Sequence, residues 1–523
     1  MPTVAPASIA SPAASTATSA GKPGGTLKIG LQREFQILDP HVDSSLADNI
    51  FFMAVFDRLI ERTPDGKLYP SLATEWSVSD DGLTWTFKLR QGVKFHDGTP
   101  FDAAAVKFNF DRIVDPATKS QSAIFSLGPY DSTTVVDDST IQVKFKTPYG
   151  RLPSSLATLG PSMVSPAAVQ KYGQDFALHP VGTGAFVFKE YIQKQHVVIT
   201  KNPDYNWASA RSTHNGPAYL DEVTFQFIPE DGTRTAALSQ GQVDGINAVQ
   251  PTDWVAFKSS GDFEASQRLV EGYPPAGIYL NVTKAPTDDL TVRKAIEFAI
   301  NKDEIIKVVF DGVGQPANGV ISTFSWAFNK DAGTLYSFDP KQAGDLLDQA
   351  GWVMGDGDYR SKDGQTLEVL YITFTTLQTL AEVVQSQLKK VGVKVNILAE
   401  DNPAQQQDAQ QGKHNLDWTQ WSGTDPDDLH KIFGSENIGN GWNFSHYSNA
   451  DVDQWFNDGA IETDSTKRKS IYDKIQQQVM EDAAYVPLYN YQVLWGFKKG
   501  LSNTDVIDAV GSSALIYDLY WDK

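Results

Sequence analysis

The pattern of apolar residues changes near Tyr273, and this change decides what the chain can fold into. Before it, apolar and polar residues alternate in short segments such as 84–90, which predicts antiparallel strands. After it, a predicted strand over 367–374, a helix over 377–391 and a strand over 393–398 follow one another. A strand–helix–strand run indicates two parallel strands joined by a crossover helix. We therefore expect a β-rich mixed block followed by an α/β block.

The end of the chain returns to strand character, over 486–491 and 493–497. If these strands rejoin the first block, the backbone crosses twice between two lobes, near Tyr273 and Leu488, which is the arrangement of a hinge. The domains predicted in this way are lobe I over 24–272 plus 488–523, with an inserted subdomain at about 66–180, and lobe II over 273–487.

The first residues predict a tether. Met1 to Ala20 consists almost wholly of Ala, Ser, Thr and Pro, which cannot bury enough apolar surface to become ordered. We expect residues 1–23 to be a disordered tether. The segment lacks the basic start and apolar stretch of a signal peptide. Such a tract is typical of an exported protein that is held on a membrane by a lipidated Cys. We expect that this Cys was removed here and that Met1 was added for expression. A cloning remnant is the alternative.

Composition excludes several classes of protein. The 523 residues include no Cys, so disulfides, thiolate metal sites and Cys nucleophiles are excluded. Acidic residues outnumber basic ones by 64 to 44, a formal charge of −20, which argues against non-specific binding to nucleic acid or anionic lipid. No apolar run approaches the ~18–20 residues that a membrane-spanning helix needs.

Motifs for catalysis and metal binding are missing from the sequence. There is no phosphate loop, nucleophile elbow or HExxH zinc motif, and the eight His residues are scattered. Gly312-Val313-Gly314 lacks the third Gly of a dinucleotide fingerprint. Asp356-Gly357-Asp358 resembles the start of a calcium loop, but Arg360 occupies the next ligand position, so we predict a tight hairpin turn. We expect no catalytic residue, no metal site and no cofactor.

Aromatic residues make up 11% of the chain, and some lie beside amides and hydroxyls in loop-like stretches. Examples are Gln420-Trp421-Ser422-Gly423 and Gly441-Trp442-Asn443-Phe444. Aromatic faces with neighbouring polar groups suit uncharged or zwitterionic ligands of sugar or peptide size. The alternative is that these aromatics only pack the core or its rim.

A series of ordered motifs carries a family resemblance over roughly 24–501. The most specific is LATEWSVSDDGLTWTFKLRQGVKFHDGTPF, from Leu72 to Phe101. The others are PVGTGAF (Pro180–Phe186), KNPDYNW (Lys201–Trp207), SQGQVDG (Ser239–Gly245), DDLTVRKAIEFAINKDEII (Asp288–Ile306), DPKQAGDLLDQAGW (Asp339–Trp352), QLKKVGVKV (Gln387–Val395) and YSNADVDQWF (Tyr447–Phe456). In these residues the chain resembles the extracellular solute-binding proteins of family 5, the dipeptide/oligopeptide/nickel-binding class that serves ABC importers.

The resemblance implies an α/β fold of the two-lobe periplasmic-binding-protein type (type II, large cluster C form) with an additional β-rich subdomain in lobe I. It implies an extracytoplasmic component, periplasmic or a cell-surface lipoprotein, that captures a small-molecule ligand between the lobes and delivers it to a permease. A ligand that contacts both lobes favours the closed state over the open one. We expect a monomer that does not catalyse a reaction, does not bind nucleic acid and meets the membrane only through a lipid anchor.

The resemblance also implies a site on two edges. In the peptide binders of the family, one edge precedes an LDP motif and the other contains a Trp that is followed by an Asp for the ligand's α-ammonium. Here Thr424 occupies that Asp position, and Asp425 begins the DPD motif that follows, which weakens the case for peptides. The expected ligand-binding residues are Glu34, Phe35, Gln36, Gln420, Trp421, Ser422, Gly423, Thr424, Asp425 and Trp442.

Several alternatives stay open. A peptide-like ligand and an oligosaccharide are both compatible with the sequence, whereas nickel finds no support in the scattered His residues. A peptide-sensing or chaperone role cannot be separated from import by sequence. A hydrolase on the same scaffold would need a nucleophile and base in the cleft, and no motif suggests one.

Overall fold

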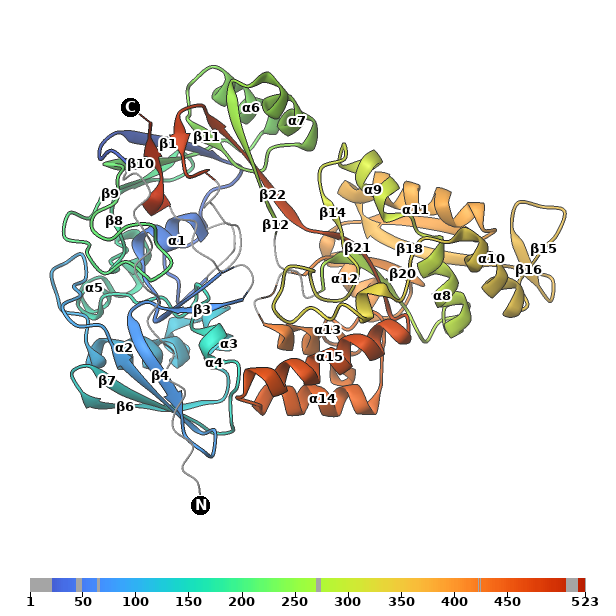
Figure 1. The fold of residues 1–523 in the computed structure, drawn as a ribbon, viewed down its shortest axis with the longest axis horizontal. Helices are drawn as coiled ribbons and strands as arrows, with labels where there is room; N and C mark the ends of the chain where they lie inside the picture. Colours follow the sequence, from blue (N-terminus) through green and yellow to red (C-terminus); the bar gives the residue numbers. More distant parts are fainter. Residues whose placement is uncertain are drawn as a thin grey trace.

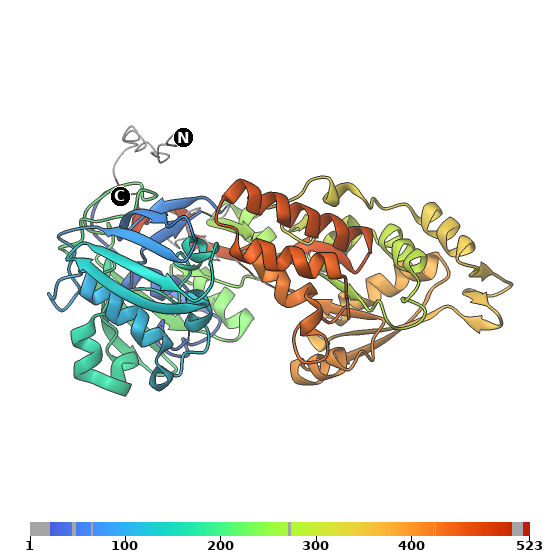
Figure 2. The ribbon, with the colours of Figure 1, turned by 90° about the horizontal axis from the view of Figure 1, so that it is seen from below.

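A computed structural model describes residues 21–43, 49–63, 66–269, 274–421, 423, 425–504 and 516–522. Residues 1–20, which make up most of the predicted tether, lie outside the described residues, as do the expected site residues Ser422 and Thr424. The described residues form two bodies that lie side by side along the long axis of the molecule (Figures 1 and 2).

The first body, which we call lobe I, is built on a seven-stranded mixed sheet and a four-stranded antiparallel sheet. β1 pairs in parallel with β10 and β11 at the centre of the larger sheet. The larger sheet runs β12 (Phe263–Leu269), β22 (Gln492–Lys498), β11 (Gly245–Ile246), β1 (Thr26–Leu31), β10 (Glu222–Phe227), β9 (His196–Lys201) and β8 (Phe186–Ile192). The smaller sheet runs β4 (Ala73–Val78), β5 (Thr84–Leu89), β7 (Thr140–Phe145) and β6 (Tyr130–Asp137). The lobe I helices are α1 (Asn49–Val55), α2 (Ala103–Val114), α3 (Ala123–Leu127), α4 (Leu152–Ser155), α5 (Pro166–Tyr172), α6 (Asp231–Ser239) and α7 (Pro251–Ser260).

The second body, lobe II, is built on a six-stranded sheet. β18 and β19 are parallel and are joined by α11, so the crossover predicted from the sequence is present. The sheet runs β14 (Gln315–Pro316), β21 (Tyr485–Asn490), β13 (Ala276–Leu280), β20 (Leu416–Thr419), β18 (Glu368–Phe374) and β19 (Lys394–Glu400). Its helices are α8 (Leu290–Ala299), α9 (Lys302–Val309), α10 (Pro340–Gln349), α11 (Gln378–Lys390), α12 (Asn402–Gln410), α13 (His430–Phe433), α14 (Ala450–Ile461) and α15 (Ser465–Glu481).

Short elements complete the two lobes. β15 (Val353–Met354), β16 (Arg360–Lys362) and β17 (Gln365–Thr366) project from the far end of lobe II (Figure 1). The Asp356–Asp358 segment lies between β15 and β16, so its prediction as a hairpin turn is confirmed. In lobe I, β2 (Ile60–Arg62) pairs with β3 (Leu68–Pro70), and β23 (Leu501–Ser502) pairs with β24 (Tyr520–Trp521).

The backbone passes from one large sheet to the other twice. The first passage lies between β12 and β13, and the second is at Tyr491, between β21 and β22. Figure 1 shows β12 and β22 reaching together from lobe I toward lobe II. β12 and β22 are paired in an antiparallel ladder, so the two passages start from one ribbon. The α/β two-lobe fold expected from the sequence is confirmed, and the limits of each lobe stay a prediction.

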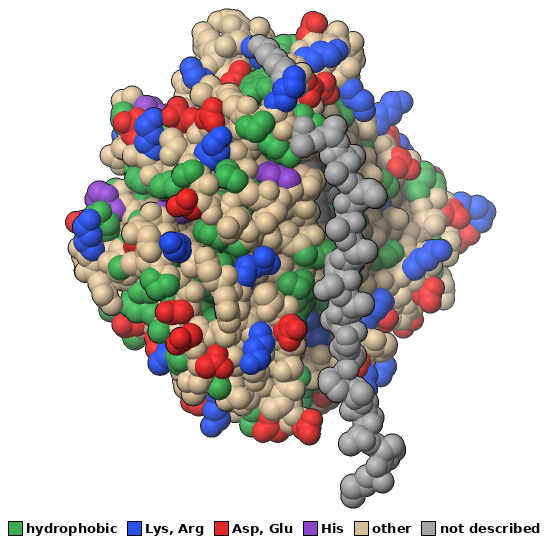
Figure 3. Space-filling view, turned by 60° about the vertical axis from the view of Figure 1, so that its left-hand side comes forward, with side chains coloured by type: hydrophobic (Ala, Val, Ile, Leu, Met, Phe, Trp, Pro, Cys, Tyr) green, Lys and Arg blue, Asp and Glu red, His purple; other side chains and the backbone are tan. Residues whose placement is uncertain are grey.

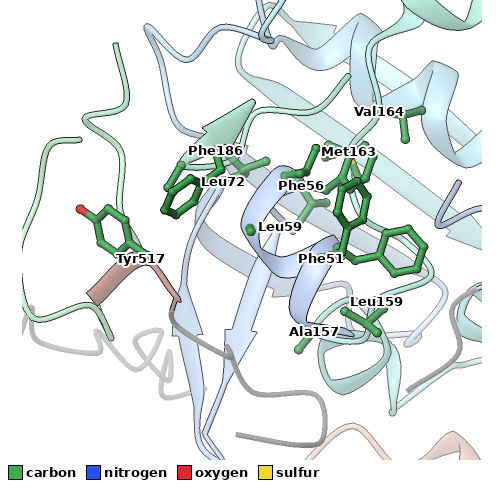
Figure 4. Close-up of a cluster of buried hydrophobic side chains, with 14 of the residues drawn as sticks. Phe51, Phe56, Leu59, Leu72, Ala157, Leu159, Met163, Val164, Phe186 and Tyr517 are labelled. Carbon is green, nitrogen blue, oxygen red and sulfur yellow. The ribbon is translucent and has the colours of Figure 1, made fainter. Parts of the chain in front are cut away.

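The lobe I core gathers around α1 and includes the end of the chain. Phe51, Phe56 and Phe186 are buried there, with Tyr517 of the C-terminal segment beside Phe186 (Figure 4). The Tyr517 hydroxyl donates to the carbonyl of Gly216 over 2.8 Å. The C-terminal segment is therefore part of lobe I. No helix within the described ranges is long and apolar enough to cross a membrane.

In the sequence, the apolar face formed by Ile50, Met53, Ala54 and Phe56 predicts a helix over 48–62, but the observed helix is shorter. α1 ends at Val55, and 60–62 form β2 instead. The amide of Gly184 donates to the carbonyl of Val55 over 2.9 Å, which takes the acceptor that a further helical turn would use. A Cβ atom at Gly182 would lie 2.2 Å from the same oxygen, so only glycine lets this loop approach. The long-helix prediction is wrong because a distant loop replaces the helical hydrogen bond.

Two of the family motifs meet at Asp57, where they hold the fold together. Its carboxylate accepts hydrogen bonds from Thr183 Oγ1 (2.9 Å) and Trp207 Nε1 (3.1 Å), residues of PVGTGAF and KNPDYNW. Tyr205 adds a third at 3.3 Å. Burial raises the pKa of Asp57 to about 6. Matches to a family in these motifs therefore report packing, and not contact with a ligand.

Candidate ligand-binding site between the lobes

The two candidate segments each follow the carboxyl end of a strand that has a parallel neighbour. β1 ends at Leu31, shortly before Glu34, and β20 ends at Thr419, directly before Gln420. β1 is parallel to β10, and β20 is parallel to β18. Crevices outside the carboxyl ends of parallel strands are the usual ligand sites of open α/β sheets. The topology therefore brings both segments to edges where a ligand can be bound.

In the lobe I segment, the three expected residues face different surroundings. The Glu34 carboxylate accepts hydrogen bonds from the Tyr191 hydroxyl (2.7 Å) and the Lys194 amide (2.6 Å), so it holds the β8–β9 turn. Phe35 is 2% exposed and packs on Phe51 and other core rings. Of the three side chains, only that of Gln36 is exposed.

In the lobe II segment, Trp421 and Trp442 come together. Their ring centroids are 4.9 Å apart, with the planes inclined at 54°. Trp442 also packs on Phe444 at 5.8 Å and keeps 36% of its surface exposed. Gln420 and Trp421 are half-buried, and Gly423 is buried. The pair forms an aromatic surface with an exposed indole, which is the kind of platform that a sugar ring or a peptide group can cover.

Asp425 is fully buried and is bound by Arg468. Its two oxygens accept from Arg468 Nη1 (2.8 Å) and Nη2 (2.5 Å), a bidentate ion pair. Although burial alone would raise its pKa, the charge and hydrogen bonds of Arg468 and the charge of Arg151 lower the pKa of Asp425 to about 2. The Asp425 carboxylate has no surface to offer to a ligand's ammonium group.

The same carboxylate fixes the start of the next element, η6 (Pro426–Leu429). Asp425 accepts from the amide of Asp427, and Asp428 accepts from the amide of Asp425, which together make a capping box. Arg468 was not predicted from the sequence, because one cation on α15 carries no local sign that it reaches a carboxylate 43 residues away.

Lobe I and lobe II touch through this element. Arg151, directly before α4, lies 3.3 Å from Asp427 (Nη1 to Oδ2) and 3.2 Å from Asp428 (Nη2 to Oδ1). The amide of Gly150 donates to the carbonyl of Ala460 over 3.1 Å. We call these five residues the ionic contact. Figure 1 shows α4 of lobe I beside the α13–α15 side of lobe II, in agreement with these contacts.

A second group of residues lies where the backbone passes between the lobes. Tyr491 is 36% exposed there. Burial raises its pKa, while the nearby charge of the exposed Arg33 lowers it. Arg33 immediately precedes Glu34 in the lobe I segment. Arg33 therefore lies near the second backbone passage between the lobes.

Side-chain clusters, surface charge and pockets elsewhere on the described chain are as follows. Within the described residues, no group of three or more His, Asp or Glu side chains could hold a metal ion. On the face in Figure 3, acidic and basic side chains are interspersed. A polar pocket of about 460 Å³ lies elsewhere on lobe II, beside Asp288, Trp352 and Lys362, and no residue of the candidate site lines it.

A two-lobe α/β body with its candidate site between the lobes defines the class of bilobal binding proteins. The family model for bacterial extracellular solute-binding proteins, family 5 (middle region), matches residues 67–440. The chain belongs to this family. The expectation of a solute-binding component of an ABC importer is confirmed, and the relatives of the chain are substrate-binding components.

Relatives of known name agree with this assignment. The chain is 30% identical over 497 residues to the glutathione-binding protein GsiB of Pectobacterium atrosepticum, covering 91% of this chain and 90% of that one. The structure of NikA from Brucella suis in complex with Fe(III)-EDTA is similar with a TM-score of 0.80, 25% identity and coverage of 95% and 100%. The Helicobacter pylori protein DppA in complex with the peptide STSA shows the same fold (TM-score 0.72, 24% identity, coverage 96% and 99%).

Proposed function

We propose that this solute-binding protein captures a small peptide-like solute whose α-ammonium group is not bound by the DPD segment. The observation that carries the proposal is the Asp425–Arg468 ion pair. Because both oxygens of Asp425 are bound by Arg468, the segment after Trp421 does not offer this carboxylate to an ammonium group. Breaking a buried ion pair to bind a ligand costs several kcal/mol, on the order of 3–5.

Two further observations support an anionic peptide-like ligand. Arg33 places a positive charge near the second backbone passage, beside Tyr491. GsiB, a relative over nine-tenths of the chain, is a glutathione-binding protein by name. Glutathione is a γ-linked tripeptide with two carboxylates, so its charges differ from those of an ordinary tripeptide. A cation in this region matches such a ligand, and Gln36, Trp421 and Trp442 provide neutral contacts.

Titration calorimetry with four solutes tests the proposal. The solutes are reduced glutathione, trialanine, N-acetyl-trialanine and maltotriose. We expect at least one peptide-like solute to bind, and N-acetyl-trialanine to bind within about tenfold of trialanine, since a tenfold change is 1.4 kcal/mol. Loss of more than a hundredfold on acetylation would contradict the proposal, because it would reveal a carboxylate partner for the amine.

A matched pair of variants locates the site. Trp442→Ala removes the exposed indole of the aromatic pair, and we expect it to weaken binding about tenfold or more. Trp352→Ala is the control, because that Trp is half-buried and lies beside the pocket on the far flank of lobe II. Equal effects of the two substitutions would place the ligand elsewhere.

An oligosaccharide is the second candidate, favoured by the Trp421–Trp442 pair, whose exposed indole can stack on a sugar ring. In the same titrations, binding of maltotriose that Trp442→Ala abolishes would select this candidate over the peptide-like one. A peptide-sensing or chaperone role would use the same site and is separated from import by whether the permease is needed in the cell.

We also infer that the protein acts outside the cytoplasm as a monomer on a lipid anchor, with its lobes divided as the sequence predicts: lobe I over 24–272 and 488–523, lobe II over 273–487. The two passages between the sheets support this division. Light scattering of the purified chain tests the monomer, and mass spectrometry of the protein from its native cells tests the lipid.

A further inference from the structure

The ionic contact joins the lobes through a small number of atoms. Side chains in it are mostly covered, with exposed fractions of 15% for Arg151, 13% for Asp427 and 8% for Asp428. One guanidinium thus bridges two neighbouring carboxylates of η6. Planar guanidinium groups suit this arrangement because their donors form a fixed fork.

The contact is built so that it can open without leaving a buried charge alone. When Arg151 leaves, Asp427 keeps the hydrogen bond from the Tyr472 hydroxyl (2.7 Å), and Asp428 keeps Lys431, whose Nζ lies at 3.6 Å. Arg151 itself keeps Ser155 Oγ, at 3.3 Å from its Nε. Breaking a buried ion pair is costly chiefly when it strands one partner. Here each partner retains a contact within its own lobe, so separation is reversible.

The contact is also connected to the candidate site by a short stretch of backbone. η6 begins directly after Asp425, which Arg468 fixes, and Trp421 lies four residues before Asp425. A ligand at the Trp421 segment would therefore lie close along the chain to the carboxylates that Arg151 meets.

A steric feature makes the closeness of the lobes testable without changing any charge. A Cβ atom built on Gly150 would lie 1.9 Å from the carbonyl oxygen of Glu462 in lobe II. Gly150 does not have a positive φ, so its own lobe accepts alanine at this position. Alanine at 150 blocks the approach of the lobes while leaving Arg151 and both carboxylates in place.

We propose that Arg151, with Asp427 and Asp428, is a closure latch that holds the lobes together even before a ligand binds. The inference rests on the proposed function in one respect, namely that the lobes open and close. A latch of this kind raises affinity, because a ligand that needs the closed state binds more tightly when that state is already populated. It also makes affinity depend on salt.

The test measures the distance between the lobes in the absence of ligand. A negative result would therefore count against the latch and would say nothing about which solute the protein binds. Since the chain has no Cys, Ser132→Cys in lobe I and Ser470→Cys in lobe II give two unique positions for spin labels. Both serines are exposed. Double electron–electron resonance then gives the distance distribution of the labelled chain, its Arg151→Ala and Gly150→Ala forms, and a Lys189→Ala control. Lys189 is a cation of the same lobe whose side chain is 54% exposed.

The latch predicts a short-distance population in the ligand-free parent that both Arg151→Ala and Gly150→Ala reduce about tenfold relative to the long-distance population. Lys189→Ala leaves the distribution unchanged. Raising the ionic strength from about 0.01 M to about 1 M shortens the Debye length from about 30 Å to about 3 Å and reduces the short population of the parent only. Arg151→Lys, which keeps the charge but not the fork, falls between parent and alanine.

Identical distributions for the parent and Arg151→Ala at low salt would overturn the latch. So would a change in Gly150→Ala alone, because the lobes would then meet there without the ion pair contributing. Circular dichroism and thermal melting of each variant establish that the lobes are folded. A change in distance can then be attributed to movement of the lobes and not to unfolding.

Discussion

Two of the regions where the described residues of the lobes meet differ in their chemistry. One is the ionic contact, where a guanidinium meets two carboxylates. The other, which we call the apolar contact, lies beside the backbone passages. There Val313 of lobe II is 5% exposed among lobe I residues such as Trp254, Phe257 and Leu494. The Thr252 hydroxyl donates to Asp311 over 2.7 Å, and Gln492 Nε2 donates to the Val313 carbonyl over 2.7 Å.

This difference indicates which region can move. Separating Val313 from its cluster exposes apolar surface on both lobes, and that cost does not depend on salt or pH. Separating Arg151 from η6 returns charges to water, where they are solvated, so the cost is small and depends on salt. We infer that the apolar contact is the pivot and the ionic contact the part that opens. The Gly312-Val313-Gly314 segment thus serves the hinge.

The largest expected effect comes from the ion pair beneath the ionic contact. Arg468→Met leaves the Asp425 carboxylate buried without its ion-pair partner and should lower the free energy of unfolding by about 3–5 kcal/mol, measured by urea denaturation. The double variant Asp425→Leu/Arg468→Met should recover most of this loss. Lys467→Met, at an exposed neighbouring position of α15, is the control. A loss below about 1 kcal/mol would mean that Asp425 is not held as described.

The second prediction concerns how the free energy of unfolding depends on pH, which should differ between the ion pair beneath the ionic contact and the apolar contact. The folded-state pKa of Asp425 is about 2, below its ordinary value of 3.8, so its stabilisation is complete above about pH 4 and is lost as pH falls toward 2. The difference in unfolding free energy between wild type and Asp425→Asn should shrink by on the order of 2 kcal/mol over this range. The difference between wild type and Val313→Ala should stay constant. A constant difference for Asp425→Asn would contradict the assignment.

Truncation within the apolar contact should have an effect of similar or slightly smaller size. Val313→Ala removes two buried methyl groups and leaves a cavity, at a cost of about 2 kcal/mol in unfolding free energy. Val308→Ala, where the side chain is 54% exposed, should cost less than about 0.5 kcal/mol. Equal small effects would show that Val313 does not anchor the pivot.

The smallest effect on stability is expected for the latch itself. Arg151→Ala should change the free energy of unfolding by less than about 1 kcal/mol, because its partners keep other contacts within their lobes. The same variant should have a clear effect on the distance between the lobes. A loss of several kcal/mol would instead make Arg151 a structural residue.

Regular elements could be predicted from the sequence because their signals are local. The alternation over 84–90 predicted β5, and the spacing of Leu380, Val384 and Leu388 predicts the helix over 377–391 that is observed as α11. The central strands β13 and β20 were not predicted. They are buried runs of five and four residues with no alternation of buried and exposed positions, and such runs cannot be told from other core segments by periodicity.

The site could be predicted less completely, since its partners are distant in the chain. Arg151 and Asp427 are 276 residues apart, and no spacing rule connects them. The resemblance identified the two segments but not the direction of each side chain, so Phe35 was expected at the site although it packs in the core. Asp425 was also expected at the site, but its carboxylate is buried and caps η6.

Distance measurement with a bound solute tests most directly whether ligand binding closes the two lobes. The Ser132→Cys/Ser470→Cys labels are measured with and without whichever of the four solutes binds in calorimetry. We expect the distance distribution to narrow to its short population on binding, and we expect the solute to be recovered unchanged. A saturated protein whose two lobes keep the ligand-free distribution, or a solute that is chemically altered, would contradict these expectations.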